Sequence, residues 1–181
     1  MKTLIVVDMQ NDFIDGALAN PAAQAIVEPM AEFLRNFDGQ ILFTMDTHEC
    51  DYLDTQEGKN LPIMHCWHGT PGWEVNNTLV KAAGMENKYN KTREHNPCSV
   101  TKRSFGDVSE LVEFLDVYTD EIYLCGTCTD ICVISVALNL KARFPEIKMY
   151  CIADLCAGLT PEKHAAALEV MRSCQIEVIQ L

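Results

Sequence analysis

Short apolar runs recur along the chain and alternate with longer stretches in which apolar and polar residues mix. Five of these runs predict β-strands by their length and their β-branched content, at residues 2–7, 40–45, 121–125, 147–152 and 176–179. The first contains an unbroken apolar run, which is typical of a strand that is buried on both faces. Weaker signals of the same kind predict two further short strands at residues 87–91 and 100–103.

Apolar residues at helical spacing separate the predicted strands. Residues 22–37 predict a helix whose regular part begins near Pro29, because proline is tolerated in a first helical turn. Residues 108–115 carry apolar side chains at i, i+3, i+4 and i+7 and predict a second helix. Residues 129–144 are apolar nearly all round, which indicates a buried helix. Residues 160–173 predict a last helix that begins with an N-cap threonine and a proline.

This alternation predicts an α/β fold for a chain of 181 residues, the length of a single domain (1–181). Strands that alternate with helices favour a central parallel sheet of about six strands, covered on both faces in a three-layer α/β/α arrangement. Ligands of such sheets bind beyond the carboxyl ends of the strands. Residues 46–73 are long, polar and punctuated by Gly and Pro, so we expect a functional loop there.

Composition and charge narrow the class of partner. The chain has 14 Lys and Arg against 26 Asp and Glu, which gives a net charge of −12. A nucleic-acid or anionic-membrane partner is disfavoured, because both require clustered basic residues. The apolar runs are far shorter than the ~20 residues of a spanning helix, and the chain enters a strand-like run without a signal-peptide pattern. We therefore expect a soluble, cytoplasmic protein with a small-molecule substrate.

Nine cysteines are many for such a chain. Their odd number and the absence of an export pattern argue against disulfides, so we expect most of them to be small buried side chains. Cys125-x-x-Cys128 would suit zinc or redox chemistry, but no second CxxC pair completes a four-ligand zinc site.

Three polar segments follow predicted strands and should therefore share one edge of the sheet. They are Asp8, Asp46-Thr-His48 and the segment from 126 to Cys132. Cys132 begins a predicted helix, where unpaired N–H groups and the helix dipole favour a thiolate, and the Asp8 carboxylate could serve as its base. The alternatives are a packed core cysteine and an aspartate that caps a loop.

The long loop contributes a candidate metal site. Two imidazoles and two carboxylates suit zinc, manganese or iron rather than calcium, and the loop offers them at Asp46, His48, Glu57 and His65. The alternative is a set of unrelated polar side chains on a solvated loop. Asp54 and His68 lie in the same loop, so the residue pattern alone leaves the ligand set open.

Taken together, these motifs resemble the isochorismatase-like cysteine hydrolase superfamily, and its nicotinamidase branch in particular. The resemblance extends over the whole chain, through residues 7–18, 46–48, 65–72, 102–106 and 126–133. It implies that Asp8 is the catalytic acid and base, Lys102 the catalytic lysine and Cys132 the nucleophile. It also implies a cis peptide at Thr127–Cys128, and an oxyanion held by the backbone N–H groups of Cys128 and Cys132.

The activity implied by the resemblance is hydrolysis of a small amide through a thioester on Cys132. The first choice of substrate is nicotinamide, which would be converted to nicotinate for NAD salvage. Another amide, such as a carbamoyl or ureido compound, is the alternative. The implied cofactor is one divalent metal, zinc before manganese or iron, with Glu57 preferred to Asp54 as third ligand. Phe13 and Trp67 are the expected substrate contacts. Thr47 replaces a tryptophan that is frequent in nicotinamidases and would form one wall for the substrate ring, and either Trp67 or Trp73 would compensate for its loss. Relatives commonly form homo-oligomers, and we expect the same here.

A non-enzymatic sensor of metals or thiols is the remaining hypothesis, and it is motivated by the many cysteines. The complete set of Asp8, Lys102 and Cys132 argues against it, and against the vinyl-ether hydrolases of the superfamily, which lack the nucleophilic cysteine.

Overall fold

A computed structural model describes residues 1–85, 99–115 and 118–181. Six parallel strands form one sheet in the order β3-β2-β1-β4-β5-β6. Their bounds are Lys2–Val7 (β1), Gln40–Asp46 (β2), Ser99–Lys102 (β3), Glu121–Thr127 (β4), Lys148–Ala157 (β5) and Glu177–Ile179 (β6). The predicted α/β class and parallel sheet are thereby confirmed.

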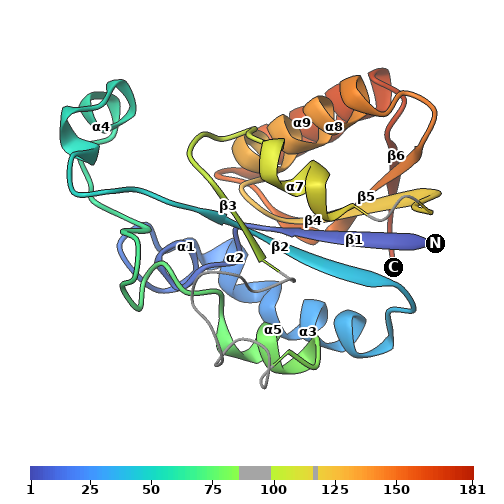
Figure 1. Cartoon of the computed structure of the whole chain (residues 1–181), viewed down its shortest axis with the longest axis horizontal. Coiled ribbons are helices and arrows are strands. Elements are labelled where there is room, and N and C mark those ends of the chain that lie inside the picture. The colour runs from blue at the N-terminus through green and yellow to red at the C-terminus, as the bar shows by residue number, and fades with distance from the viewer. Residues whose placement is uncertain (86–98, 116–117) are drawn as a thin grey trace.

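Helices cover both faces of this sheet and complete the three layers (Figure 1). On one face lie α1 (Asn11–Ile14), α2 (Pro21–Ala25), α3 (Val27–Asn36) and α5 (Asn77–Ala82). On the other lie α7 (Ser109–Phe114), α8 (Ile134–Arg143) and α9 (Pro161–Ser173). No helix in the three described ranges is long and apolar enough to cross a membrane.

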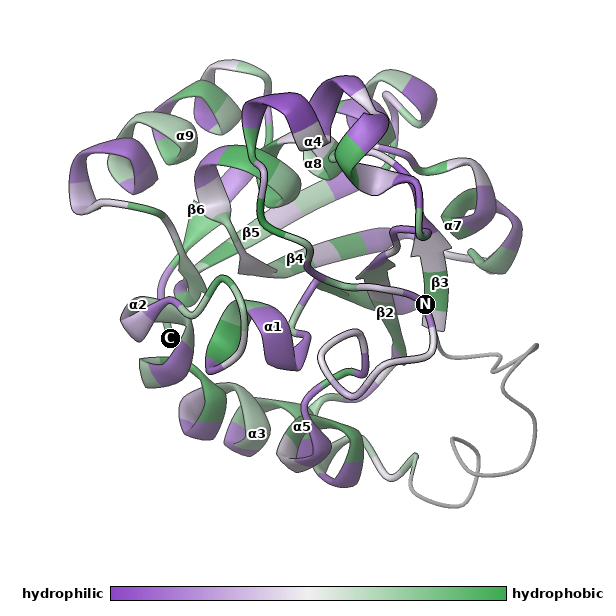
Figure 2. Ribbon diagram, turned by 90° about the vertical axis from the view of Figure 1, so that its left-hand side faces the viewer, coloured by the Kyte–Doolittle hydropathy of each residue, from purple (hydrophilic) through white to green (hydrophobic). Residues whose placement is uncertain are grey.

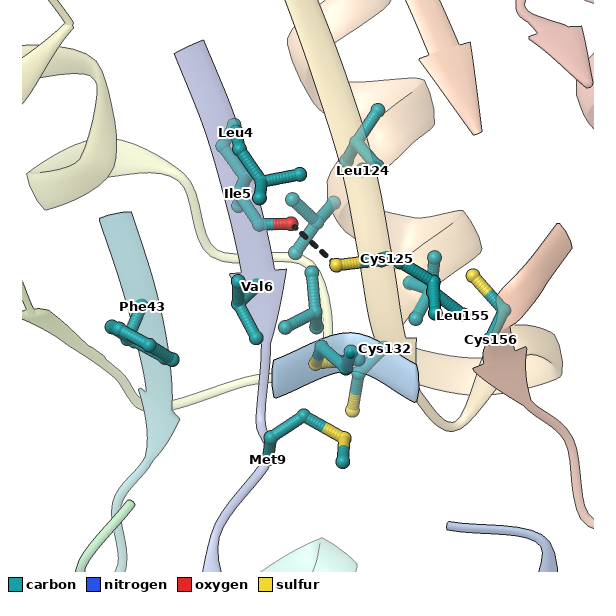
Figure 3. Close-up of a cluster of buried hydrophobic side chains, with 14 of the residues drawn as sticks. Leu4, Ile5, Val6, Met9, Phe43, Leu124, Cys125, Cys132, Leu155 and Cys156 are labelled. Atoms are coloured by element: carbon teal, nitrogen blue, oxygen red, sulfur yellow. Dashed lines mark hydrogen bonds between the residues drawn. The ribbon is translucent and has the colours of Figure 1, made fainter. Parts of the chain in front are cut away.

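The core is centred on β1 and β4, which lie side by side in the middle of the sheet (Figure 3). Leu4, Ile5 and Val6 are fully buried, as the unbroken apolar run predicts, and Leu124 and Cys125 pack beside them from β4. Hydrophobic and hydrophilic residues alternate along the helices (Figure 2), and in α3 the hydrophobic Val27, Met30, Ala31 and Leu34 are buried. The strands therefore form a rigid base from which the loops at their ends project.

Several elements differ in detail from those predicted. The helix expected at 22–37 is divided at Ile26, and β5 continues to Ala157 through a bulge that breaks its register with β4. The helix expected at 129–144 begins with a π-helical segment, Thr129–Val133, and several of its apolar side chains are only partly buried. The strand expected at 87–91 lies outside the described residues.

The loop expected at 46–73 contains two short helical segments, a 3₁₀ turn at Tyr52–Asp54 and α4 (Gln56–Asn60). Both are too short to produce a periodic pattern in the sequence, and the same is true of α1 and α5. In Figure 1 this loop extends beyond the carboxyl end of β2.

The winding direction of the sheet reverses between β1 and β4. The chain winds outward from β1 to β2 and β3, then returns to β4 and winds the other way to β5 and β6. The loops that follow β1 and β4 therefore diverge to opposite faces, which opens the space where ligands of such sheets bind. Asp8 directly follows β1, and the segment with Cys132 directly follows β4.

Candidate active site

Asp8 is fully buried at the point where the chain leaves the sheet. Its φ of 51° turns the backbone out of β1, and its N–H donates to the Thr44 carbonyl oxygen at 3.2 Å. The Thr44 hydroxyl donates to Asp8 Oδ1 at 2.7 Å, which fixes the carboxylate. The other oxygen, Oδ2, lies 2.8 Å from Lys102 Nζ.

Lys102, the last residue of β3, joins three reactive groups. Its Nζ lies 2.8 Å from Asp8 Oδ2, 3.3 Å from Asp46 Oδ1 and 3.6 Å from Cys132 Sγ, and the side chain is fully buried. Burial by itself lowers the pKa of Lys102, but Asp8, Cys132 and Asp46 together raise that pKa well above its usual range. The lysine therefore stays charged inside the protein and favours negative charge on its neighbours.

Cys132 is buried in the π-helical segment, and this burial opposes the effect of a helix start, which favours a thiolate. Burial, followed by the Asp8 carboxylate, raises the pKa of the Cys132 thiol well above its usual range, and Lys102 offsets part of the rise. Burial also raises the pKa of Asp8, against the effect of Lys102. Desolvation outweighs the helix start here. The thiol consequently needs a base, and a carboxylate with a raised pKa is a better base than an ordinary one.

Cys128 lies at the start of the segment that carries Cys132. The Thr127–Cys128 peptide is cis, as the resemblance implies. The Cys128 carbonyl accepts hydrogen bonds from the N–H groups of Ile131 and Val133, both at 3.1 Å. These bonds connect Cys128 to the backbone on both sides of Cys132.

The four candidate metal ligands meet in one group. One ligand atom from each of Asp46, His48, Glu57 and His65 can be chosen so that all lie within 4.8 Å of one another. His48 Nε2 lies 3.0 Å from Asp46 Oδ2 and 3.7 Å from Glu57 Oε1, and His65 Nε2 lies 3.5 Å from Asp46 Oδ2. Two imidazoles and two carboxylates at this spacing fit a divalent transition metal.

The alternatives within the loop lie elsewhere. In the described part of the chain Asp54 does not join the group, and His68 instead pairs with Glu49 on the surface at 3.5 Å. His65 Nδ1 contacts the Ile63 carbonyl oxygen at 2.8 Å, which leaves Nε2 facing the other ligands. The structure thus brings Glu57 rather than Asp54 to the candidate metal centre.

Asp46 belongs both to the group of candidate metal ligands and to the reactive cluster, which consists of Asp8, Asp46, Lys102 and Cys132. Its Oδ2 faces His48 and His65, whereas its Oδ1 faces Lys102. Hydrogen bonds from the two histidines and the charge of Lys102 outweigh burial and hold the pKa of Asp46 well below its usual range. One ionised carboxylate therefore connects the metal group to Lys102.

The aromatic candidates differ in their surroundings. Phe13 is partly buried and meets His65 edge-on, with ring centroids 5.6 Å apart. Trp67 is 46% exposed, whereas Trp73 is buried and its Nε1 donates to the Thr47 hydroxyl at 2.8 Å. Trp73 therefore packs against Thr47, the residue that replaces the expected tryptophan. It is a stronger candidate than Trp67 for the aromatic side chain that would take the place of that tryptophan beside the substrate.

Two polar residues beside the site, the partly buried Asp12 and the fully buried Gln10, were not among the predicted site residues. Asp12 Oδ2 accepts the Cys66 N–H at 2.7 Å, next to His65, and the Gln10 amide contacts the Asp46 backbone. Both occur in a segment whose composition predicts turns. Their roles depend on partners 36 to 54 residues away, which spacing within the segment does not indicate.

Known proteins resemble the chain over its whole length. Nicotinamidase/pyrazinamidase of Mycobacterium tuberculosis is 27% identical, over 99% of this chain and 98% of that protein. The structure of pyrazinamidase of Pyrococcus horikoshii in complex with zinc matches with a TM-score of 0.77 and 27% identity, over 99% of both chains. Pyrazinamidase/nicotinamidase of Streptococcus mutans matches with a TM-score of 0.78 and 27% identity, over 99% and 100% of the two chains.

A family model covers nearly every residue as well. The model, described as the isochorismatase domain, matches residues 2–181. The matched range contains all six strands and every residue of the candidate site. The chain therefore belongs to the isochorismatase family.

Proposed function

We propose that the protein is a cysteine amidohydrolase that converts nicotinamide and water to nicotinate and ammonia. The observation that carries the proposal is the position of Lys102 Nζ, within 3.6 Å of Asp8, Asp46 and Cys132 in a buried cluster at the carboxyl ends of the strands. A purely structural cysteine would not need a buried ion pair beside it.

The chemistry follows from the pKa values of the cluster. Asp8 takes the proton of the Cys132 thiol, whose pKa is too high for it to ionise unaided. The sulfur then forms a bond to the amide carbonyl carbon, and the N–H groups of Cys128 and Cys132 stabilise the oxyanion. Asp8 returns its proton to the departing nitrogen, and ammonia leaves a thioester. Asp8 then takes a proton from water, the water oxygen bonds to the thioester carbonyl carbon, the carbon–sulfur bond breaks, and Asp8 returns the proton to the Cys132 sulfur, which leaves the acid and the free thiol.

Asp46, His48, Glu57 and His65 would hold a divalent metal, for which we propose zinc. The two-histidine, two-carboxylate group suits zinc, and a similar protein has been solved in complex with it. When bound, such an ion supplies a Lewis acid that can orient a pyridine nitrogen or a water molecule. Phe13, beside His65, is the proposed contact for the flat ring of the substrate.

A second substrate class has one observation in its favour. Thr47, hydrogen-bonded to Trp73, stands between two proposed metal ligands where nicotinamidases often carry tryptophan. The wall of the pocket therefore differs from theirs, and a different small amide would use the same Asp8, Lys102 and Cys132.

Turnover of nicotinamide tests the proposal directly. Metal-analysed protein is incubated with nicotinamide, and both nicotinate and ammonia are measured, beside Cys132→Ala and the matched control Cys151→Ala, another buried thiol in β5. We expect wild-type kcat/KM above about 10⁴ M⁻¹s⁻¹, a similar value for Cys151→Ala, and no turnover by Cys132→Ala. Absence of wild-type turnover with the metal bound would retire nicotinamide as substrate and require a screen of small amides.

A further inference from the structure

A fully buried glutamine stands just beyond β1, beside the site but without a place in the proposed chemistry. Gln10 has no exposed surface, and its side chain is directed at β2 rather than at the reactive cluster. A buried amide is costly unless its polar atoms are paired, so the partners of Gln10 indicate what it does.

Those partners belong mainly to Asp46. Gln10 Oε1 accepts the Asp46 N–H at 2.8 Å, and Nε2 donates to the Asp46 carbonyl at 2.9 Å and to the Trp73 carbonyl at 2.7 Å. All of these are short bonds between neutral groups in a buried environment. The glutamine amide thus contacts both backbone polar groups of one residue.

The end of strand pairing explains why Asp46 needs such a partner. The β1–β2 register ends at Val7 and Thr44, because Asp8 turns the chain out of the sheet. The β2–β3 register continues to Asp46 and Lys102 on the other side. Beside β1, the last residue of β2 would have no strand neighbour, and the Gln10 amide takes the place of the missing peptide group.

From this geometry we infer that Gln10 is a positioning residue, which acts on the candidate metal site and on Lys102 through the backbone of Asp46. By holding both the N–H and the carbonyl of Asp46, Gln10 keeps the Asp46 carboxylate oriented with Oδ2 toward His48 and His65 and Oδ1 toward Lys102. Gln10 touches neither Cys132 nor the ligand atoms in the described structure. The part of the inference that concerns turnover rests on the proposed function, whereas the part that concerns metal affinity does not.

Strand β2, whose last residue Gln10 contacts, also contains a glutamine that serves as a matched control. Gln40, at the opposite end of β2, donates from Nε2 to the Phe114 carbonyl at 2.9 Å and accepts the Thr3 hydroxyl at 3.1 Å. It is a partly buried glutamine that also bonds a main-chain carbonyl, far from the site. If Gln10 merely stabilises the sheet, Gln10→Met and Gln40→Met should have similar effects, because methionine keeps the size of glutamine and removes its amide.

The experiment compares wild type, Gln10→Met, Gln10→Asn and Gln40→Met. Chelator-stripped proteins are titrated with zinc against a chromophoric competitor, and far-UV circular dichroism verifies that each is folded. Loss of hydrogen bonds that orient a ligand typically weakens metal binding by about 10- to 100-fold. We expect a zinc Kd at least about tenfold weaker for Gln10→Met, an intermediate loss for the shorter Gln10→Asn, and a Kd within about twofold of wild type for Gln40→Met.

Kinetics with nicotinamide supply the second measurement. We expect kcat of metal-saturated Gln10→Met to fall about tenfold or more with a smaller change in KM, because Asp46 also contacts Lys102. Unchanged zinc affinity in folded Gln10→Met, or an equal loss in Gln40→Met, would overturn the inference. Failure of both Gln10 variants to fold would make the residue structural and overturn it too. Absence of zinc binding by the wild type would have the same effect, whereas absence of nicotinamide turnover alone would retire only the proposed substrate.

Discussion

Gly126, in β4 just before the segment that carries Cys132, provides the sharpest test of the packing between the two central strands. Its φ is 124°, and a Cβ added there would lie 2.1 Å from the Val7 carbonyl oxygen and 2.7 Å from the Val7 nitrogen. The oxygen would have to retreat by about 1.3 Å to reach an ordinary contact of 3.4 Å. The contacting atoms belong to the backbone of a buried strand, so rotation of a side chain cannot relieve the overlap.

The expected cost of Gly126→Ala has two parts. A left-handed backbone costs alanine about 1–2 kcal/mol, and separating β1 from β4 weakens ladder hydrogen bonds that contribute about 1 kcal/mol each. We therefore expect a loss of at least about 3–4 kcal/mol in the free energy of unfolding. Domains of this kind typically have about 5–15 kcal/mol in total, so the loss would be severe.

Gly84→Ala is the control that separates these two parts. Gly84 also has a positive φ, 69°, but among the described residues nothing lies within 4 Å of its added Cβ. Urea unfolding followed by circular dichroism should show a loss of about 1–2 kcal/mol for Gly84→Ala and a clearly larger loss for Gly126→Ala. Equal losses for the two variants would refute the argument from backbone overlap.

Two further predictions concern which cysteines react with an alkylating agent and how the stability of the protein depends on pH. Iodoacetamide labelling mapped by mass spectrometry should modify the exposed Cys50 and Cys174 in the native protein and leave Cys125 unmodified until urea unfolds it, because burial raises the pKa of Cys125; labelling of native Cys125 as fast as Cys50 would contradict this. Asp107 accepts hydrogen bonds from the Ser109 hydroxyl at 2.6 Å and N–H at 3.0 Å, and these bonds lower its pKa. A lowered pKa stabilises the folded state above the unfolded pKa of about 3.9, and this stabilisation declines as pH falls from there through the lower folded pKa. The urea midpoints of wild type and Asp107→Asn should therefore differ by a constant amount from pH 7 down to about pH 4 and begin to converge below it; a difference that stays constant down to pH 2 would contradict a stabilising role of the Asp107 carboxylate.

The fold could be predicted because its main determinants are local. The apolar run of β1 and the capped start of α9 at Thr160 each lie within a few consecutive residues. Once the strands were known to be parallel, Asp8, Asp46 and Cys132 had to meet, since the carboxyl ends of parallel strands share an edge.

The remaining features depend on distant partners or on burial, which a single sequence does not reveal. Lys102 has no distinguishing pattern of its own, and its assignment required the resemblance. The residue pattern alone left Glu57 and Asp54 both open, the resemblance favoured Glu57, and α4 places Glu57 beside His48. The pKa of the Cys132 thiol depends on desolvation and on the charges of Asp8 and Lys102, and these follow from the fold rather than from the position of Cys132 in its own segment.

The divided carboxylate of Asp46 limits how this protein can evolve. Its two oxygens face two different groups, so a substitution there alters metal affinity and the surroundings of Lys102 together. A descendant that abandoned the metal would still be under selection to keep an anion beside the buried lysine. Among the described contacts, His48 and His65 do not contact Lys102, so they could be replaced first without changing its surroundings. Persistence of this aspartate in a chain without the histidines would therefore be the trace of a lost metal site.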